Sequence, residues 1–305
     1  MINCTSILFV ISFGLISCST DTPMDQITDN EMSQDSIDME PEIDPVAHIA
    51  LIAQFPSGIN ECSGMIKIDD KILSMNDGSN HTLLQQINPN TAEILSTISI
   101  NQIANNDWEA LQYSDGNIYI ADTGNNEGDR ENLSLYTIPY DSGSELTCTD
   151  TINFIWPDQI SFESSFAHPF DCESLLIDDE TAIFFSKNRS DLKTNVYRMN
   201  LSTEEIVKGE SISIGGLSTD AVFDPSGDVI LLSYLTLNGS SFINKINILE
   251  TVDETFQLKE SIGIDPNTQI EAIVHLEDHK YLLGAESESS EGGYLYSLDL
   301  GEYYE

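Results

Sequence analysis

Basic residues are scarce in this chain. Only 11 Lys and Arg stand against 52 Asp and Glu among 305 residues, which gives a formal net charge of −41 at pH 7. A field of this sign repels nucleic-acid phosphates and anionic lipid headgroups, so no nucleic-acid partner is expected. Cations and basic ligands are the natural partners of such a surface, although acidic side chains also simply keep an exported protein soluble.

Common catalytic signatures are absent as well. The sequence contains no GxSxG, P-loop, HExxH or dinucleotide-binding motif, and no CxxC or His-Cys cluster of the zinc type. Of the five cysteines, Cys62, Cys148 and Cys172 fall in the part expected to fold. Three thiols cannot all pair with one another, and we expect buried structural thiols. Apolar residues make up 40% of the chain, enough for a large core.

An apolar run near the amino terminus is too short to span a bilayer. The run "SILFVISFGLIS" covers residues 6–17, and "LISC" ends it at Cys18. This pattern resembles the lipobox of bacterial lipoproteins, which implies a signal peptide at 1–17 and lipid attached to Cys18. Buried acyl chains anchor a protein by about 0.8 kcal/mol per methylene. We therefore expect a lipid-anchored protein of the cell envelope, on the outer membrane of a Gram-negative bacterium; ordinary secretion is the alternative.

The segment that follows has the composition of a linker. Residues 19–46 contain nine acidic residues and no basic residue, with Pro, Ser, Thr and Met between them. Like charges repel one another, and no hydrophobic periodicity is present. We predict an acidic disordered tether at 18–46, followed by a folded domain at 47–305.

A short motif recurs along the predicted domain. The copies are "DWEAL" (107–111), "DCESL" (171–175), "STDAV" (218–222), "QIEAI" (269–273) and a degenerate "NECSG" (60–64). When the copies are aligned on the small residue, four of the preceding positions are carboxylates and the fifth, Cys62, has Glu61 beside it. The four carboxylates are Glu109, Glu173, Asp220 and Glu271.

The residues that follow each copy of the motif predict β-strands. A turn leads to an aliphatic strand, a polar loop follows, and further alternating strands such as "LSLYTIP" and "NVYRMNL" come next. Four antiparallel strands per roughly 50 residues make one blade of a β-propeller. We predict an all-β fold with five blades, in which "AHIALIAQF" (47–55) supplies the fourth strand of the last blade and closes the ring. The alternative is six blades, with a cryptic repeat between Glu109 and Glu173.

The repeated acids suggest a cation site. The innermost strands of a propeller line its axis, so equivalent positions form a ring there. Carboxylates gathered in a partly desolvated space either take up protons or hold a cation, and oxygen ligands suit Ca²⁺. We predict a Ca²⁺ ion held by Glu109, Glu173, Asp220, Glu271 and Glu61. In the alternative interpretation these acids cap strands or face a water-filled channel.

The motifs together resemble known propellers. "DWEAL…IYIADTGNN", "HPFDCESL…AIFFSKNR", "STDAVFDPSGD" and "IEAIVH…YLLGAE" are similar to exported bacterial β-propeller proteins of the SMP-30/NHL or phytase-esterase-like type. More distantly, acids that open five blades resemble the calcium-dependent apyrases, although their Lys- and Arg-containing nucleotide-binding segments have no counterpart here. The first resemblance implies a propeller without an assigned activity, and the second implies a central Ca²⁺.

Catalytic candidates are few. His168, in "HPFDCE", is the one acid or base candidate, and a structural role is the alternative. Lys187, Arg189, Lys193 and Arg198 gather in one blade, where they either bind an anion or pair with carboxylates. We expect a monomeric, membrane-anchored binding or scaffold module for a protein, glycan or small molecule. The alternative function is a calcium-dependent hydrolase of phosphoesters or other esters.

Overall fold

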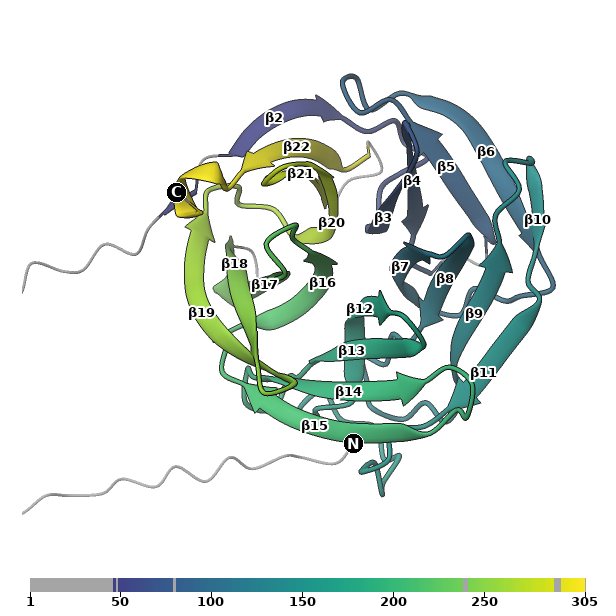
Figure 1. Cartoon of the computed structure of the whole chain (residues 1–305), viewed down its shortest axis with the longest axis vertical. Helices are drawn as coiled ribbons and strands as arrows, with labels where there is room; N and C mark the ends of the chain where they lie inside the picture. The colour runs from purple at the N-terminus through teal and green to yellow at the C-terminus, as the bar shows by residue number, and fades with distance from the viewer. Residues whose placement is uncertain (1–45, 48, 79–80, 238–240, 288–291, 305) are drawn as a thin grey trace, which may run out of the picture. The chain divides into compact units, whose positions relative to one another are not determined.

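The computed structural model describes residues 46–304, except 48, 79–80, 238–240 and 288–291. This part of the chain consists of strands and loops with one short 3-10 helix, Gly301–Tyr303. Five sheets surround a common axis (Figure 1), which confirms the predicted five-bladed all-β propeller. The predicted signal peptide, Cys18 and the tether lie outside the described residues. Within the described ranges, no helix has the length and apolarity needed to cross a membrane.

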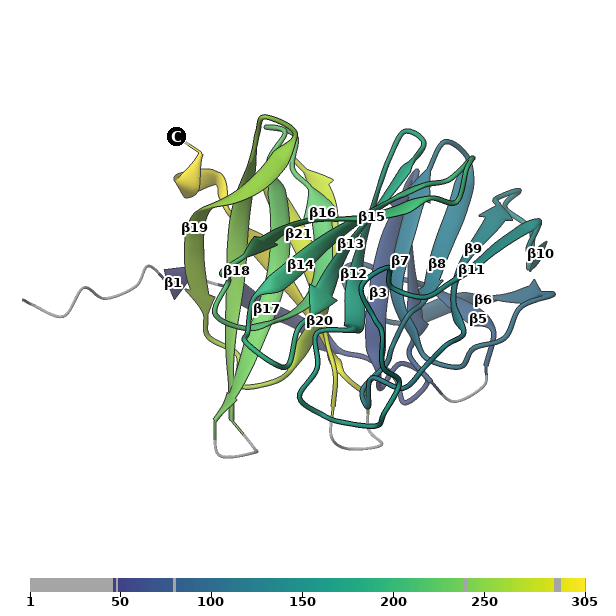
Figure 2. The same ribbon diagram turned by 90° about the horizontal axis from the view of Figure 1, so that it is seen from below.

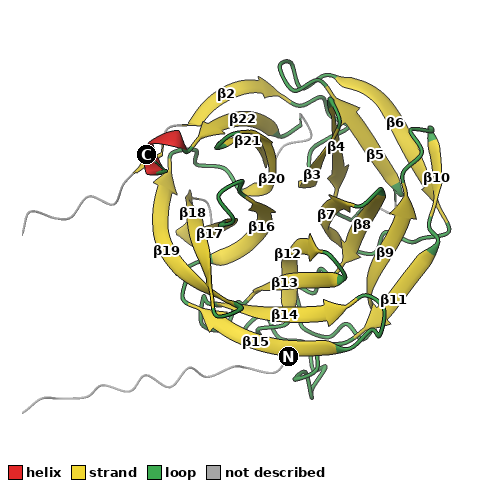
Figure 3. Ribbon diagram, in the orientation of Figure 1, coloured by secondary structure: helices red, strands yellow, loops and turns green. Residues whose placement is uncertain are grey.

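Each blade contains four antiparallel strands, which are yellow in Figure 3. The innermost strands are β3 (Cys62–Ile68), β7 (Trp108–Ser114), β12 (Asp171–Asp178), β16 (Leu217–Phe223) and β20 (Ile270–Glu277). The second strands are β4 (Lys71–Asn76), β8 (Asn117–Asp122), β13 (Thr181–Lys187), β17 (Val229–Leu237) and β21 (Lys280–Ala285). The third strands are β5 (Leu83–Ile87), β9 (Leu133–Pro139), β14 (Thr194–Asn200), β18 (Ser241–Val252) and β22 (Tyr294–Asp299). The outer strands are β6 (Ile94–Asn101), β11 (Asp150–Phe154), β15 (Ile206–Ile212), β19 (Thr255–Ile264) and β2 (Ile49–Gln54).

The amino-terminal strand closes the ring as predicted. β2 pairs antiparallel with β22, with Ile49 opposite Leu298 and Gln54 opposite Tyr294. The last blade therefore combines three strands from the carboxyl terminus with one from the amino terminus of the domain. This pairing covers the outer edge of β22, which an open ring would expose to other chains.

The alternative with six blades is wrong. The long unit between Glu109 and Glu173 contains one blade, and its extra residues form a three-residue strand and a long loop instead. The strand, β10 (Glu145–Thr147), pairs parallel with β6 and extends the first blade outward. The loop, 155–170, connects β11 to β12. A similar two-residue strand, β1 (Val46–Ala47), pairs parallel with β19.

The hydrophobic core is divided among the contacts between blades. Each of five buried clusters draws residues from two neighbouring blades, so every blade packs on both faces. Trp108 belongs to the cluster between the first and second blades, and Trp156 packs on Phe184 and Tyr197 between the second and third. Cys62, Cys148 and Cys172 are buried free thiols, as expected. In the edge-on view of Figure 2, the innermost strands run through the middle of the propeller.

Candidate functional site

A β-bulge interrupts the innermost strand of every blade at the repeated motif. In the second, third and fifth blades one residue is left unpaired between two register positions, and that residue is Glu109, Glu173 or Glu271. The bulge turns these side chains away from the ladder, which is how bulges commonly re-aim a functional group. The equivalent residues form what we call the bulge ring: Ser63, Glu109, Glu173, Thr219 and Glu271.

Two members of the bulge ring are committed to backbone contacts. The Ser63 hydroxyl donates to the Trp108 carbonyl at 3.0 Å, and the Thr219 hydroxyl donates to the Ile270 carbonyl at 2.9 Å. Both bonds join neighbouring blades. The three glutamates remain, and all three line one cavity at this end of the axis.

The second strands contribute another layer of side chains to the same cavity. In each blade, the residue before the bulge pairs with a residue of the second strand. The next residue along that second strand belongs to what we call the second-strand ring: Asp77, Thr123, Lys187, Tyr234 and Glu286. All of these except Thr123 line the cavity, together with Asn126, Arg189 and Gln269. The cavity has a volume of about 210 Å³. Its lining is wholly polar, and carboxylates outnumber basic side chains.

A buried lysine supplies positive charge on the axis. The Lys187 amine donates to Glu173 Oε1 and lies 3.4 Å from Glu271 Oε1; the three residues are only 2–5% exposed. It also lies over the Tyr234 ring at 5.1 Å from the centroid, a favourable cation–π distance. Burial opposes the charge of Lys187, but the two carboxylates outweigh burial and raise the pKa of the amine well above its ordinary value. Lys187 is therefore a permanent counterion for Glu173 and Glu271.

Proton sharing neutralises part of the remaining negative charge. Burial, followed by the nearby Glu271, raises the pKa of Glu286 to about 11. Glu286 is therefore protonated at neutral pH and hydrogen-bonds the Glu271 carboxylate. Burial, followed by the Glu173 charge, raises the pKa of Glu109 well above its ordinary value.

A second basic side chain is paired on another wall of the cavity. Arg189 donates to Asp171 Oδ2 from two nitrogens, at 3.0 and 2.7 Å.

Three carboxylates gather beside the cavity, between the first and second blades. One oxygen from each of Asp77, Asp107 and Glu109 lies within 4.8 Å of the other two. Burial, followed by the Glu61 charge, raises the pKa of Asp77 to about 8. Burial, followed by the Asp171 charge, raises the pKa of Asp107 to about 6. Glu61, a predicted ligand, contacts this cluster through a hydrogen bond with Asp77.

Asp220 does not join the glutamates. Its Oδ2 accepts the Ile273 N–H of the next blade at 2.8 Å, and its Oδ1 accepts the Ala221 N–H at 2.8 Å. The bulge of the fourth blade contains two residues instead of one, so Thr219 takes the ring position and Asp220 turns towards the neighbouring strand. For Asp220, this geometry corresponds to the strand-capping alternative.

His168 is held by backbone groups. Its Nε2 lies 3.1 Å from the Asn126 carbonyl, and its Nδ1 accepts the Phe170 N–H at 3.1 Å. With both ring nitrogens engaged and the ring buried, the imidazole fixes the loop that leads into β12. This geometry favours the structural interpretation of His168.

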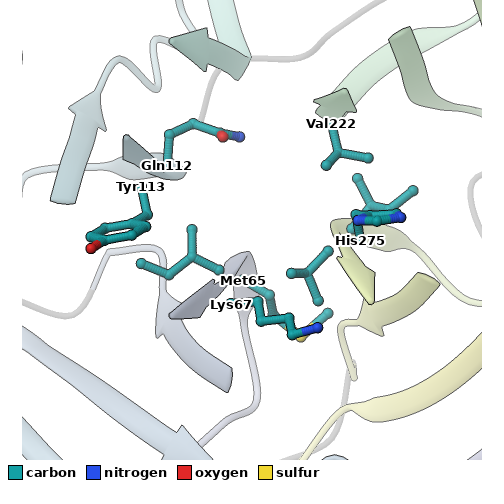
Figure 4. Close-up of a pocket in the computed structure, with 9 residues that line it drawn as sticks. Met65, Lys67, Gln112, Tyr113, Val222 and His275 are labelled. Atoms are coloured by element: carbon teal, nitrogen blue, oxygen red, sulfur yellow. The ribbon is translucent and has the colours of Figure 1, made fainter. Parts of the chain in front are cut away.

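The opposite end of the axis has a different chemistry. A cavity of about 150 Å³ is lined mainly by apolar side chains from β3, β7, β16 and β20. Figure 4 shows Met65, Val222, Lys67 and His275 around its opening. The Gln112 amide donates to the Ala221 carbonyl at 3.1 Å, from the second blade to the fourth, and thus bridges the axis at this level.

Asp77, Asp107 and Glu286 lie at the site but were not among the residues predicted from the sequence, whereas Lys187 and Arg189 were, and both pair with carboxylates. Asp107 stands inside the quoted "DWEAL", two positions before the bulge residue, where Glu61 and Asp171 stand in other copies. Lys187 is the last residue of the aliphatic strand that follows its motif, and Asp77 and Glu286 come directly after the equivalent strands. Aligning those strand ends would have shown that they are equivalent, but only the strand register shows that they face the bulge ring.

Comparison with known proteins supports the fold. No protein-family model matches the chain, and no curated protein matches its sequence. Among solved structures, an exo-β-1,3-galactanase from Clostridium thermocellum is similar with a TM-score of 0.54 and 10% identity, over 81% of this chain and 62% of that one. An exo-β-1,3-galactanase from Phanerochaete chrysosporium, solved with β-1,3-galactotriose, gives 0.53 and 11%, over 84% and 64%. A putative oxidoreductase (glucose dehydrogenase) from Thermus thermophilus gives 0.48 and 10%, over 83% and 99%. The chain thus spans under two thirds of either galactanase, and the likeness establishes a propeller fold that is shared with enzymes.

Proposed function

We propose that this protein is a binding propeller that holds a glycan in the acidic cavity of its axis. The observation that carries the proposal is the wholly polar lining of that cavity, in which hydrogen-bond acceptors outnumber free donors. Lys187 and Arg189 are already engaged by carboxylates. A ligand that supplies donors is therefore favoured, and ionised carboxylates accept hydrogen bonds only.

Hydroxyl groups fit this lining better than a cationic amine. Gln269 and Asn126 offer amide groups that both donate and accept, and the ammonium of Lys187 on the wall repels a second cation. The volume of about 210 Å³ is below the roughly 300 to 1,000 Å³ of drug-sized sites, so one sugar unit would enter the cavity. A galactanase with the same fold was solved with galactotriose, which supports this ligand class.

Calorimetric titration of the full-length protein with neutral mono- and oligosaccharides tests the proposal. We expect saturable binding that Glu271→Gln weakens at least tenfold. Glu163→Gln is the matched control, because Glu163 is a glutamate exposed in the 155–170 loop, and it should leave the affinity unchanged. Failure of every sugar to bind, or equal losses in both variants, would reject a glycan site on the axis.

A calcium-dependent hydrolase of phosphoesters or other esters is the second candidate. The cluster of Asp77, Asp107 and Glu109 favours it, because a cation there would lie beside the cavity and could polarise a bound ester. Assays with nucleotides, phytate and aryl esters, with Ca²⁺ and with EDTA, distinguish it from pure binding. Calcium-dependent turnover that disappears in Glu109→Gln would establish catalysis.

We also propose that a lipid on Cys18 anchors the propeller as a monomer in the outer membrane, as the lipobox-like run implies. Metabolic labelling with a fatty-acid analogue, followed by fractionation of the envelope, tests this. Label that persists in Cys18→Ser, or a chain that fractionates with soluble proteins, would contradict the anchor.

A further inference from the structure

Because Lys187 already compensates two carboxylates on the axis, a bound cation is needed elsewhere in the site. Lys187 lies between Glu173 and Glu271 and supplies the positive charge that two buried carboxylates require. A metal ion on the axis would have to share that space with the ammonium group. The carboxylates that still lack a cation lie to one side, where the first and second blades meet.

From this arrangement we propose that Asp77, Asp107 and Glu109 bind one Ca²⁺ ion beside the axis. Their ligand oxygens lie within 4.8 Å of one another. Three oxygens spaced 4.8 Å apart would each lie about 2.8 Å from their common centre, so side-chain shifts of a few tenths of an ångström would bring them to the roughly 2.3–2.6 Å at which Ca²⁺ is bound. A donor set made only of carboxylates, with room for water, suits Ca²⁺ better than the stricter octahedron of Mg²⁺.

An unsatisfied buried carboxylate independently indicates a missing ligand. Glu109 is 5% exposed, and among the described residues its carboxylate forms no hydrogen bond or ion pair, although the charge of Lys187 lowers its pKa. Across the same cavity, Glu173 Oε2 is buried without a hydrogen-bond partner, although Oε1 of that residue is paired with Lys187. Buried polar groups are normally satisfied, so the two glutamates point to a ligand in the cavity that they both line.

Gly124 leaves room for these carboxylates. A Cβ at this position would lie 2.3 Å from Asp107 Oδ2 and 2.5 Å from Glu109 Oε1. The Gly124 N–H also donates to the Asp107 carbonyl at 3.2 Å, which keeps the glycine against the cluster. Any side chain at position 124 would therefore occupy the space in which the two oxygens converge.

Asn105 holds the two contributing loops together. Its amide nitrogen donates to the Asp77 carbonyl at 3.1 Å, and its oxygen accepts the Trp108 N–H at 3.3 Å. One buried side chain thus joins the segment that carries Asp77 to the strand that carries Glu109. This preorganisation reduces the cost of assembling ligands from two blades around an ion.

Terbium luminescence of the full-length protein in 150 mM KCl tests the proposal. Tb³⁺ replaces Ca²⁺, and Trp108, next to both Asp107 and Glu109 in the chain, is the sensitiser. We expect one saturable Tb³⁺ site from which Ca²⁺ displaces the probe. Asp107→Asn, Glu109→Gln and Gly124→Ala should each weaken Ca²⁺ at least tenfold, whereas Glu163→Gln should change it less than twofold.

Two controls distinguish loss of Ca²⁺ binding from loss of folding and from an effect on the axis. In EDTA the Asp107→Asn and Glu109→Gln variants should unfold no earlier than the wild type, because the first removes a repelling charge and the second replaces a buried carboxyl group that lacks a hydrogen-bond donor; earlier unfolding would show that the carboxylates are structural. Glu271→Gln separates this site from the axis and should weaken Ca²⁺ less than threefold. An equal loss in Glu271→Gln and Asp107→Asn, or no saturable site in salt, overturns the proposal.

The inference deepens the proposed function by adding a cation beside the same cavity. The two fail separately, because saccharide binding without Ca²⁺ binding overturns this inference alone. A chain that binds Ca²⁺ and no saccharide overturns only the glycan proposal.

Discussion

Replacing Lys187 with methionine should destabilise the propeller strongly. The substitution keeps an unbranched side chain of similar length but removes the charge that faces Glu173 and Glu271. Removing one partner of a buried ion pair costs about 3 to 5 kcal/mol, because the remaining charge stays buried without compensation. Loss of the cation–π contact with Tyr234, at 5.1 Å, adds to this destabilisation, by about 1 kcal/mol.

The pH dependence of this loss identifies its cause. Without Lys187, the folded state can relieve the repulsion by protonating Glu173, whose pKa burial already raises well above its ordinary value, and this becomes easier as the pH falls. We therefore expect the difference in unfolding free energy between wild type and Lys187→Met to be largest near pH 7.5 and at least halved near pH 5. Adding Glu173→Gln and Glu271→Gln to Lys187→Met should restore most of the stability at pH 7.5, because neither side chain that faced Lys187 then carries a charge.

Urea unfolding in EDTA, followed by tryptophan fluorescence, measures these differences. Trp108 and Trp156 are fully buried, so their emission reports loss of the packing between blades. A loss below about 1 kcal/mol for Lys187→Met, the range of exposed ion pairs, would refute a buried counterion. So would a triple variant that is no more stable than Lys187→Met.

Four further outcomes follow from the same contacts. Burial raises the pKa of Asp107 from 3.8 to about 6, so in EDTA the contribution of this group to stability is greatest below about pH 4 and falls by about 1 to 2 kcal/mol between about pH 4 and pH 6, after allowance for partial exposure; urea unfolding at pH 4.5 and 7.5 should show that Asp107→Asn gains stability relative to the wild type as the pH rises. Asp220→Ala leaves the Ile273 N–H without its acceptor, so it should cost about 2 kcal/mol in urea unfolding and leave Ca²⁺ affinity unchanged; weakened Ca²⁺ would instead make Asp220 a ligand. His168→Ala should lower stability by about 1 to 2 kcal/mol without altering saccharide affinity by calorimetry, and any loss of turnover found in the hydrolase assays would revive its catalytic role. A chain that begins at Pro56 lacks β2, so the exposed edge of β22 should cause self-association in size-exclusion chromatography; a monomeric, cooperatively folded product would show that closure by β2 is dispensable.

The repeated acids illustrate why a motif alignment identifies a ring only in part. Glu109, Glu173 and Glu271 occupy the same unpaired position of their bulges and share one cavity, as the spacing predicted. Asp220 occupies the same aligned position in the sequence motif but lies elsewhere in the structure, because one extra residue lies between the paired positions of its bulge. One more residue in a bulge turns the following side chain towards a different strand. The number of residues in a bulge cannot be read from the amino-acid sequence alone.

The sequence by itself determined the architecture of this protein. Five copies of one motif, alternation with a period of two and a strand left over at residues 47–55 are local properties of the chain, and together they led to five blades and their closure. These properties suffice because a blade can bury its two faces only against other blades. The tertiary structure decided the chemistry of the cavity. Lys187, Asp77 and Glu286 lie at or directly after the ends of strands that look alike in the sequence, and only the register across each blade brings them to the bulge ring. Which carboxylates face a lysine, which share a proton and which lack a partner depends on distances of a few ångströms between segments far apart in the chain.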